Sequence, residues 1–192
     1  CGVGEHYDVL SPAICNSPTY TSSNFKCGER YFAVEAPERN CTCIENQQVS
    51  LLENKLADLE GGAEAVIFGS DIDLISIILL ASLKEGDEIL FDSAPCASIL
   101  SSINCDLIRR GVKIRHVDMM NVAVVERAIG PATRVIYFET PANPKMRLVD
   151  IEEIARITRH AGVKLVVDNT FCTPYLQQPL LLGADVSLHS MM

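Results

Sequence analysis

The sequence lacks the features that mark a membrane span, a secretory leader or a nucleic-acid-binding surface. It has no tryptophan, and its longest apolar run, residues 74–83, is about half of the roughly 20 residues that a bilayer span needs. Its first 17 residues have neither the basic start nor the apolar block of a signal peptide. Basic residues are scarce, and the formal net charge is -9. Because such a chain repels phosphates and anionic lipid surfaces, we expect no nucleic-acid partner and no membrane partner.

The cysteines also lack the arrangement that a zinc site or a disulfide scaffold would need. The chain has 8 of them, with no CxxC pair and no Cys/His spacing typical of zinc. Dispersed thiols on an α/β pattern favour a reducing compartment, so we expect a cytoplasmic protein without a metal. Disulfides or a metal site are the alternative.

The composition and periodicity of the sequence change near residue 48. Residues 1–48 are rich in Ser, Thr, Asn, Pro and Cys and show little periodicity, which indicates an extended N-terminal arm. From residue 49 onwards, short apolar runs alternate with helical patterns. This alternation is typical of an α/β fold with a mainly parallel sheet flanked by helices. We therefore expect an arm over 1–48 and one α/β domain over 49–192.

Apolar periodicity and turn residues locate the expected elements. A helix that carries Val49, Leu52, Leu56 and Leu59 on one face ends at Gly61. Further helices are expected over 72–83, 98–110, 122–129, 151–160 and 175–182. Strands are expected over 65–68, 88–91, 112–117, 134–139, 164–168 and 186–189. Ligands of such sheets bind beyond the carboxyl ends of the strands, which directs attention to residues 69–71, 139–144 and 168–170.

Three blocks near the end of the chain carry a specific resemblance. They are ETPANP at 139–144, VDNTFCTP at 167–174, and GAD at 183–185 followed by HS at 189–190. With LEGG at 59–62, KEGD at 84–87 and LVDI at 148–151, the chain resembles the Cys/Met-metabolism family of pyridoxal-phosphate (PLP) enzymes. This family includes methionine γ-lyase, cystathionine γ-lyase and cystathionine γ-synthase, and residues 137–144 are slightly more similar to methionine γ-lyase. The resemblance implies the large PLP-binding domain of fold-type I (aspartate aminotransferase-like) enzymes, with the C-terminal domain absent.

The resemblance also implies roles for individual residues. PLP acts as an electron sink while its ring nitrogen stays protonated, and Asp168 is the carboxylate implied beside that nitrogen. Asn143 is implied near the ring and Ser190 at the phosphate, while Ser70 and Thr170 complete the implied cofactor contacts. Without the resemblance, residues 168–170 are also explained as a plain strand-ending turn.

Five positions depart from the family pattern, and each departure weakens the same pocket. Cys41 and Cys43 replace a tyrosine and an arginine that reach the phosphate, and Cys96 replaces the aromatic residue that stacks on the ring. Asp71 replaces a glycine of the phosphate loop, where it would satisfy the helix dipole itself, and Met192 replaces a hydroxyl residue. The position of the Schiff-base lysine would follow Met192, so this lysine is absent from the sequence. A metal or redox role for the three cysteines is the alternative to substitution by small apolar residues.

The sequence thus predicts a pseudoenzyme related to the PLP-dependent carbon–sulfur lyases of sulfur amino-acid metabolism. We expect a structural, scaffolding or assembly role, with no catalytic residue in the chain and with PLP bound weakly or not at all. The expected partners are further copies in a homo-oligomer, a family paralogue or a larger protein assembly. The alternative is a fragment of an active or partly active γ-lyase whose Schiff-base lysine lies just after Met192.

Overall fold

The computed structural model describes residues 46–93 and 106–191, together with the isolated residues 14, 16, 18, 19, 25 and 29. The chain divides into two units, one of Cys1–Asp58 and Glu64–Ile67 and one of Leu59–Ala63 and Phe68–Met192. Helix α2 (Gln47–Glu60) accounts for most of the described part of the first unit. The expected arm over 1–48 lies almost wholly outside the described residues, so that boundary stays a prediction.

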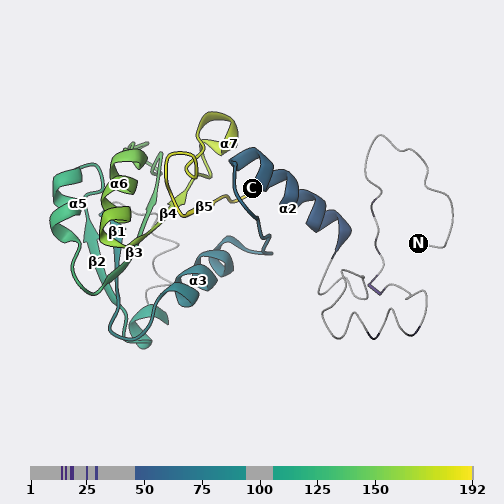
Figure 1. The fold of residues 1–192 in the computed structure, drawn as a ribbon, viewed down its shortest axis with the longest axis horizontal. Coiled ribbons are helices and arrows are strands. Elements are labelled where there is room, and N and C mark those ends of the chain that lie inside the picture. The colour runs from purple at the N-terminus through teal and green to yellow at the C-terminus, as the bar shows by residue number, and fades with distance from the viewer. Residues whose placement is uncertain are drawn as a thin grey trace. The chain divides into compact units, whose positions relative to one another are not determined.

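A five-stranded parallel sheet forms the centre of the second unit (Figure 1). Its strands are β1 (Glu88–Asp92), β2 (Lys113–Val117), β3 (Thr133–Glu139), β4 (Lys164–Asp168) and β5 (Val186–Leu188). They lie in the order β2-β1-β3-β4-β5, and every neighbouring pair is parallel. The expected α/β fold with a mainly parallel sheet is confirmed. The strand order changes direction between β1 and β3, which is where ligands of open α/β sheets bind.

Helices cover both faces of this sheet, so its strands are buried on both sides. The helices are α3 (Asp71–Ser82), α5 (Val122–Ala128), α6 (Ile151–Ala161) and the short α7 (Thr173–Leu176). Successive side chains of a strand point to opposite faces. Tyr137 of β3 accordingly packs in the same cluster as Leu79 of α3, whereas Phe138 packs in the cluster that contains Ile154 of α6. The centre of β3, residues 135–138, is apolar because both clusters need it.

Helix α6 shows how local sequence sets the limits of an element. The side chain of Asp150 accepts a hydrogen bond from the Glu153 N–H at 3.0 Å and caps the first turn. Basic residues lie in the last turn, where they complement the helix dipole. The helix ends at Gly162, whose φ of 68° is a left-handed conformation that glycine adopts readily.

Three expected elements differ from the structure or extend beyond its described part. Residues 65–68 form no strand: the backbone N–H of Ile67 donates to the Glu53 carboxylate at 3.0 Å, and the segment has no strand neighbour among the described residues. The helical turn expected over 175–182 lies earlier, at α7, because Pro174 favours the first turn of a helix. Of the helix expected over 98–110, residues 106–109 are helical and residues 98–105 lie outside the description.

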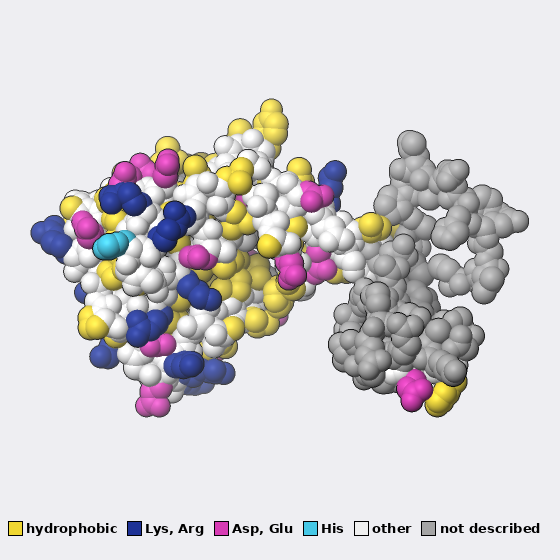
Figure 2. Space-filling model, in the orientation of Figure 1, with side chains coloured by type: hydrophobic (Ala, Val, Ile, Leu, Met, Phe, Trp, Pro, Cys, Tyr) yellow, Lys and Arg dark blue, Asp and Glu magenta, His cyan; other side chains and the backbone are white. Residues whose placement is uncertain are grey.

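Helix α3 is apolar on every side, but only one of its faces is buried. Ile75 and Leu79 are buried, whereas Ile77 is 47% exposed. Figure 2 shows hydrophobic side chains gathered over this helix, and it shows Lys and Arg interspersed with Asp and Glu elsewhere on the same face of the second unit. Among the described residues, no helix is long and apolar enough to cross a membrane.

We expect Leu79→Ala to lower the free energy of unfolding by about 2–5 kcal/mol, because Leu79 is 0% exposed and its removal leaves a cavity beside the sheet. Ile77→Ala, on the exposed side of the same helix, should cost less than about 1 kcal/mol. Urea unfolding followed by circular dichroism measures both. Equal losses in the two variants would contradict the assignment of the buried face.

Candidate functional site

Three neighbouring strands each end in an acidic residue at the carboxyl edge of the sheet. Asp92 ends β1, Glu139 ends β3 and Asp168 ends β4. Glu139 and Asp168 are partners in the β3–β4 register. Asp92 is 3% exposed and Asp168 is 8% exposed, whereas Glu139 is half-buried. This edge is therefore strongly acidic and only partly open to water.

The Asp168 carboxylate is held by neutral donors. Its Oδ1 accepts hydrogen bonds from the backbone N–H of Thr170 at 3.1 Å and from the Thr170 hydroxyl at 2.6 Å. Its Oδ2 accepts one from the Tyr137 hydroxyl at 3.2 Å. A carboxylate has about four acceptor positions, so the described residues leave one position on Oδ2 for a further donor. Among the described residues, no Lys, Arg or His forms an ion pair with Asp168.

The negative charge of Asp168 acts on the carboxyl group of Glu139. Burial raises the pKa of the Glu139 carboxyl above its usual value, and the charge of Asp168 raises it further. The backbone N–H of Asn143 donates to this carboxylate and opposes part of the shift. This hydrogen bond places Asn143 beside Glu139, at the end of the strand next to the one that carries Asp168. The Asn143 residue is exposed.

A hydrogen-bond relay joins three of the residues that the resemblance assigns to the cofactor. The backbone N–H of Ser190 donates to the Thr170 hydroxyl at 2.9 Å, and that hydroxyl donates to Asp168. Asp168, Thr170 and Ser190 thus form one unit across the ends of β4 and β5. A role for these residues in cofactor binding stays a prediction.

Ser70 lies outside this relay. It is the N-cap of α3, where its hydroxyl accepts from the Asp73 N–H at 3.4 Å. The Asp71 carboxylate accepts from the Ile72 N–H at 2.8 Å. No described hydrogen bond links Ser70 to the other four predicted site residues, which are Asp168, Thr170, Asn143 and Ser190. The departures at Cys41, Cys43, Cys96 and Met192 lie outside the described residues.

A buried polar network beside the relay was missed by the sequence reasoning. Glu60, the last residue of α2, is 5% exposed, and its Oε1 accepts from Asn169 at 3.3 Å, from Ser187 at 3.1 Å and from His189 Nε2. Asn169 is fully buried and also exchanges hydrogen bonds with Gln177. A signal for Glu60 was present, because it lies four residues after Leu56 and so continues the apolar stripe of the helix.

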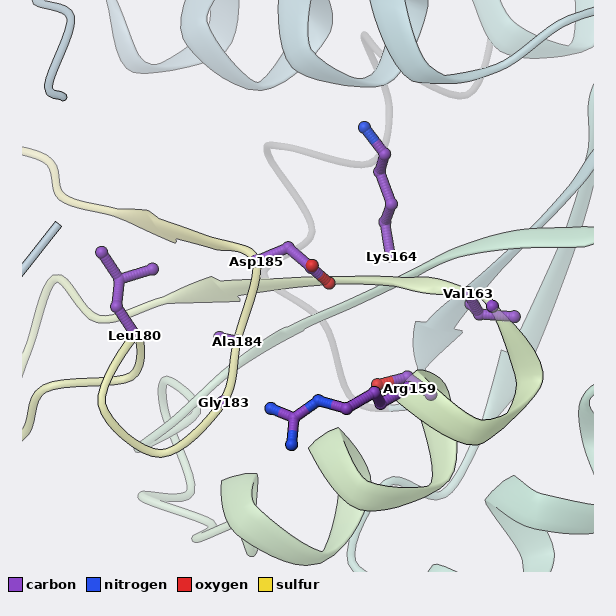
Figure 3. Close-up of a pocket in the computed structure, with 9 residues that line it drawn as sticks. Arg159, Val163, Lys164, Leu180, Gly183, Ala184 and Asp185 are labelled. Carbon is purple, nitrogen blue, oxygen red and sulfur yellow. The ribbon is translucent and has the colours of Figure 1, made fainter. Parts of the chain in front are cut away.

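A hollow of about 380 Å³ lies at the other end of β4 (Figure 3). Lys164 begins β4 and Asp168 ends it, so the hollow is roughly 13 Å along the strand from the relay. Figure 3 shows the Arg159 side chain directed toward the Gly183 loop, whereas Lys164 points away from it. The Asp185 carboxylate accepts from the Leu165 N–H at 2.7 Å and serves to fasten this loop to the sheet. The hollow therefore has no part in the relay.

Comparison with known proteins gives this arrangement a family. Residues 3–192 match the Cys/Met metabolism PLP-dependent enzymes, so the chain belongs to that family. It is 41% identical to L-methionine gamma-lyase of Pseudomonas putida over 186 residues, which is 97% of this chain and 47% of that protein. The chain thus spans about half the length of this relative.

Solved structures of family members show the same fold. The crystal structure of metB from Corynebacterium glutamicum matches with a TM-score of 0.85 and 33% identity, over 97% of this chain and 47% of that one. A putative O-acetylhomoserine (thiol)-lyase from Campylobacter jejuni, solved with pyridoxyl-lysine monophosphate, matches with a TM-score of 0.84 and 26% identity, over 95% of this chain and 45% of that one. The expected family and the fold-type I architecture are both confirmed.

The described residues fit one end of PLP and not the other. At the ring end, the vacant acceptor position on Asp168 Oδ2 suits the N–H of a protonated pyridine. At the phosphate end, the first turn of α3 already donates to Ser70 and Asp71, and it carries two carboxylates of its own. A helix N-terminus binds a phosphate through free N–H groups and its positive dipole end. Here two of these N–H groups donate to side chains of the turn, and the carboxylates of Asp71 and Asp73 oppose an incoming anion.

We expect Glu139→Gln to stabilise the protein at pH 7. Because the pKa of Glu139 is raised in the folded state, the wild-type carboxyl favours folding at low pH and loses that contribution as the pH rises through its folded pKa. The neutral amide removes this loss and keeps an acceptor for Asn143. The gain should therefore vanish below about pH 4.5, the usual value for glutamate.

Urea unfolding across pH 3.5 to 8 measures this difference, with Glu64→Gln as the control because Glu64 is an exposed loop carboxylate. A gain that persists unchanged at low pH, or one that the control reproduces, would show that the raised pKa of Glu139 is not its cause.

Proposed function

We propose that this protein is a non-catalytic relative of the PLP-dependent carbon–sulfur lyases that retains the ring side of the cofactor pocket and has lost the phosphate side. The observation that carries the proposal is the first turn of α3. Its Asp73 N–H and Ile72 N–H are occupied by side chains of the turn itself, and Asp71 is exposed at the helix end where an anion would approach. PLP would then bind through its ring contacts alone, and weakly.

Three further positions support this proposal. Cys41 and Cys43 offer neither the charge nor the reach of an arginine, and Cys96 offers no ring for stacking. A lost charged contact to a phosphate costs on the order of 2–5 kcal/mol of binding. A lost aromatic stack costs roughly 0.5–1.5 kcal/mol. Together these losses are large enough to change a tightly held cofactor into a loosely bound one.

The proposal predicts that the phosphate contributes little to binding. Pyridoxine and pyridoxine 5′-phosphate have no aldehyde, so neither forms an imine with surface lysines. Isothermal titration calorimetry measures the affinity of each one. We expect the two to agree within about threefold. Asp71→Asn should tighten pyridoxine 5′-phosphate by about tenfold and leave pyridoxine unchanged, because it removes repulsion worth about 1.4 kcal/mol.

The matched control is Glu152→Gln, which removes an exposed carboxylate from the first turn of another helix, α6. It should change neither affinity. Preference of the wild-type protein for the phosphate ester by a hundredfold or more would sink the proposal, since it would demonstrate a working phosphate site.

An active carbon–sulfur lyase is the second candidate, and the hydrogen-bonded Asp168 favours it. The relay from Ser190 through Thr170 keeps the ring-nitrogen acceptor in place, and a protein with no use for the cofactor ring would have no need of it. Incubation of the full-length protein with PLP and L-methionine distinguishes the two candidates. We expect no consumption of L-methionine above a protein-free control, and turnover would establish the active candidate instead.

For the role that replaces catalysis, we propose assembly with further copies of the chain or with a competent family paralogue. The support is the family fold together with the exposed apolar side of α3, which has no cover among the described residues. Co-expression with a tagged paralogue followed by mass determination of the purified complex tests this. Recovery of the paralogue alone, with this protein monomeric, would count against it.

A further inference from the structure

The buried Glu60 carboxylate joins three donors from two strands. Asn169 directly follows β4, Ser187 lies within β5 and His189 directly follows β5. All three donate to the same oxygen, Oε1, while Oε2 is buried and has no hydrogen-bond partner among the described residues. A carboxylate with this burial is costly unless hydrogen-bonded partners compensate it. One of its three partners is the imidazole of His189.

Stability alone does not explain a buried carboxylate–imidazole pair at this position. Replacing a buried ion pair by well-packed neutral residues is often neutral or stabilising. Buried pairs of this kind are better explained by what they hold in register. Strand β5 needs such a device, because it has only three residues and pairs with β4 alone among the described strands.

The pair of Glu60 and His189 fixes the position of the first donor of the relay, the Ser190 N–H. His189 is followed directly by Ser190, whose backbone N–H donates to the Thr170 hydroxyl, which in turn donates to Asp168. A shift of His189 would therefore move the Ser190 N–H away from Thr170. The Thr170 hydroxyl would lose the partner that orients it toward Oδ1 of Asp168.

We propose that Glu60 is a positioning residue that, through its pair with His189, sets the orientation of the Asp168 carboxylate. This inference rests on the proposed function only in its last step, that the Asp168 carboxylate receives a pyridine ring. The earlier steps concern hydrogen bonds within the chain, so they are measurable without any ligand.

Amide hydrogen exchange by NMR tests the positioning directly. In Glu60→Gln, which keeps the shape and removes the charge, we expect the Ser190 N–H to exchange at least tenfold faster. The amides of Ile136 and Leu165, in the fully buried centre of the sheet, should change by less than twofold. Thr170→Val removes the acceptor itself and is the positive control.

Ser187→Ala is the matched control: it removes one donor from the same oxygen and the contact of the Ser187 hydroxyl with His189 Nε2 at 3.2 Å, while both side chains of the Glu60–His189 pair remain. It should raise the Ser190 exchange rate by less than threefold. If Glu60→Gln does not fold, His189→Gln tests the pair from its other side, since glutamine keeps a neutral donor. Equal acceleration at Ser190, Ile136 and Leu165 in the folded variant would overturn the proposal, as would an unchanged rate at Ser190.

The second measurement is the affinity for pyridoxine in the two single variants and in the double variant. A general loss of stability would not produce the pattern of affinities expected for these three variants. We expect Glu60→Gln and His189→Gln each to weaken pyridoxine binding by about fivefold or more. The double variant should be no weaker than either single variant, because both act through one pair. Additive losses would overturn the positioning role. If the wild-type protein binds no pyridoxine, the proposed function fails while the exchange result still decides the role of Glu60.

Discussion

The structure depends on how a buried carboxylate, Asp168, is satisfied without a cation among the described residues. Desolvating a carboxylate costs several kcal/mol unless hydrogen bonds or a positive charge offset the loss of water. Here a tyrosine hydroxyl, a threonine hydroxyl and a backbone N–H supply three donors, and one acceptor position is left. The ends of β3, β4 and β5 are arranged around this requirement. The adjacent Glu139 makes it harder to meet, because a second negative charge raises the electrostatic cost.

The acidic edge and the first turn of α3 are the two observations on which the proposed difference between the ring end and the phosphate end of a PLP site rests. A site rich in carboxylates favours a protonated ring nitrogen and disfavours a phosphate dianion. The ring side keeps its acceptor, held by Thr170 and, through His189 and Ser190, by Glu60. At the first turn of α3, the N–H groups of Ile72 and Asp73 donate to side chains of the turn itself. The proposed retention of the ring side and the proposed loss of the phosphate side therefore rest on the same electrostatic preference.

Much of the fold and part of the site were predictable from the sequence. The strands at 88–91, 134–139 and 164–168 were placed within one or two residues, because their apolar runs serve a sheet that is buried on both faces. The segment 65–68 has the same apolar character and forms no strand. Strand formation needs a neighbour to complete the backbone hydrogen bonds, and a local pattern carries no information about neighbours. Glu60 was missed for a related reason, since its three partners lie more than 100 residues away.

The sequence by itself determined the alternation of strands and helices and the family to which the chain belongs. These follow from short-range periodicity, from turn chemistry and from motifs whose residues are adjacent in the chain. Only the tertiary structure decided which polar groups meet: that Ser190 reaches Thr170, that Glu139 lies beside Asp168, and that Ser70 lies outside the relay. Hydrogen bonds and charge interactions act over a few ångströms in space, and the parallel register, rather than the order of residues, brings these groups within that range.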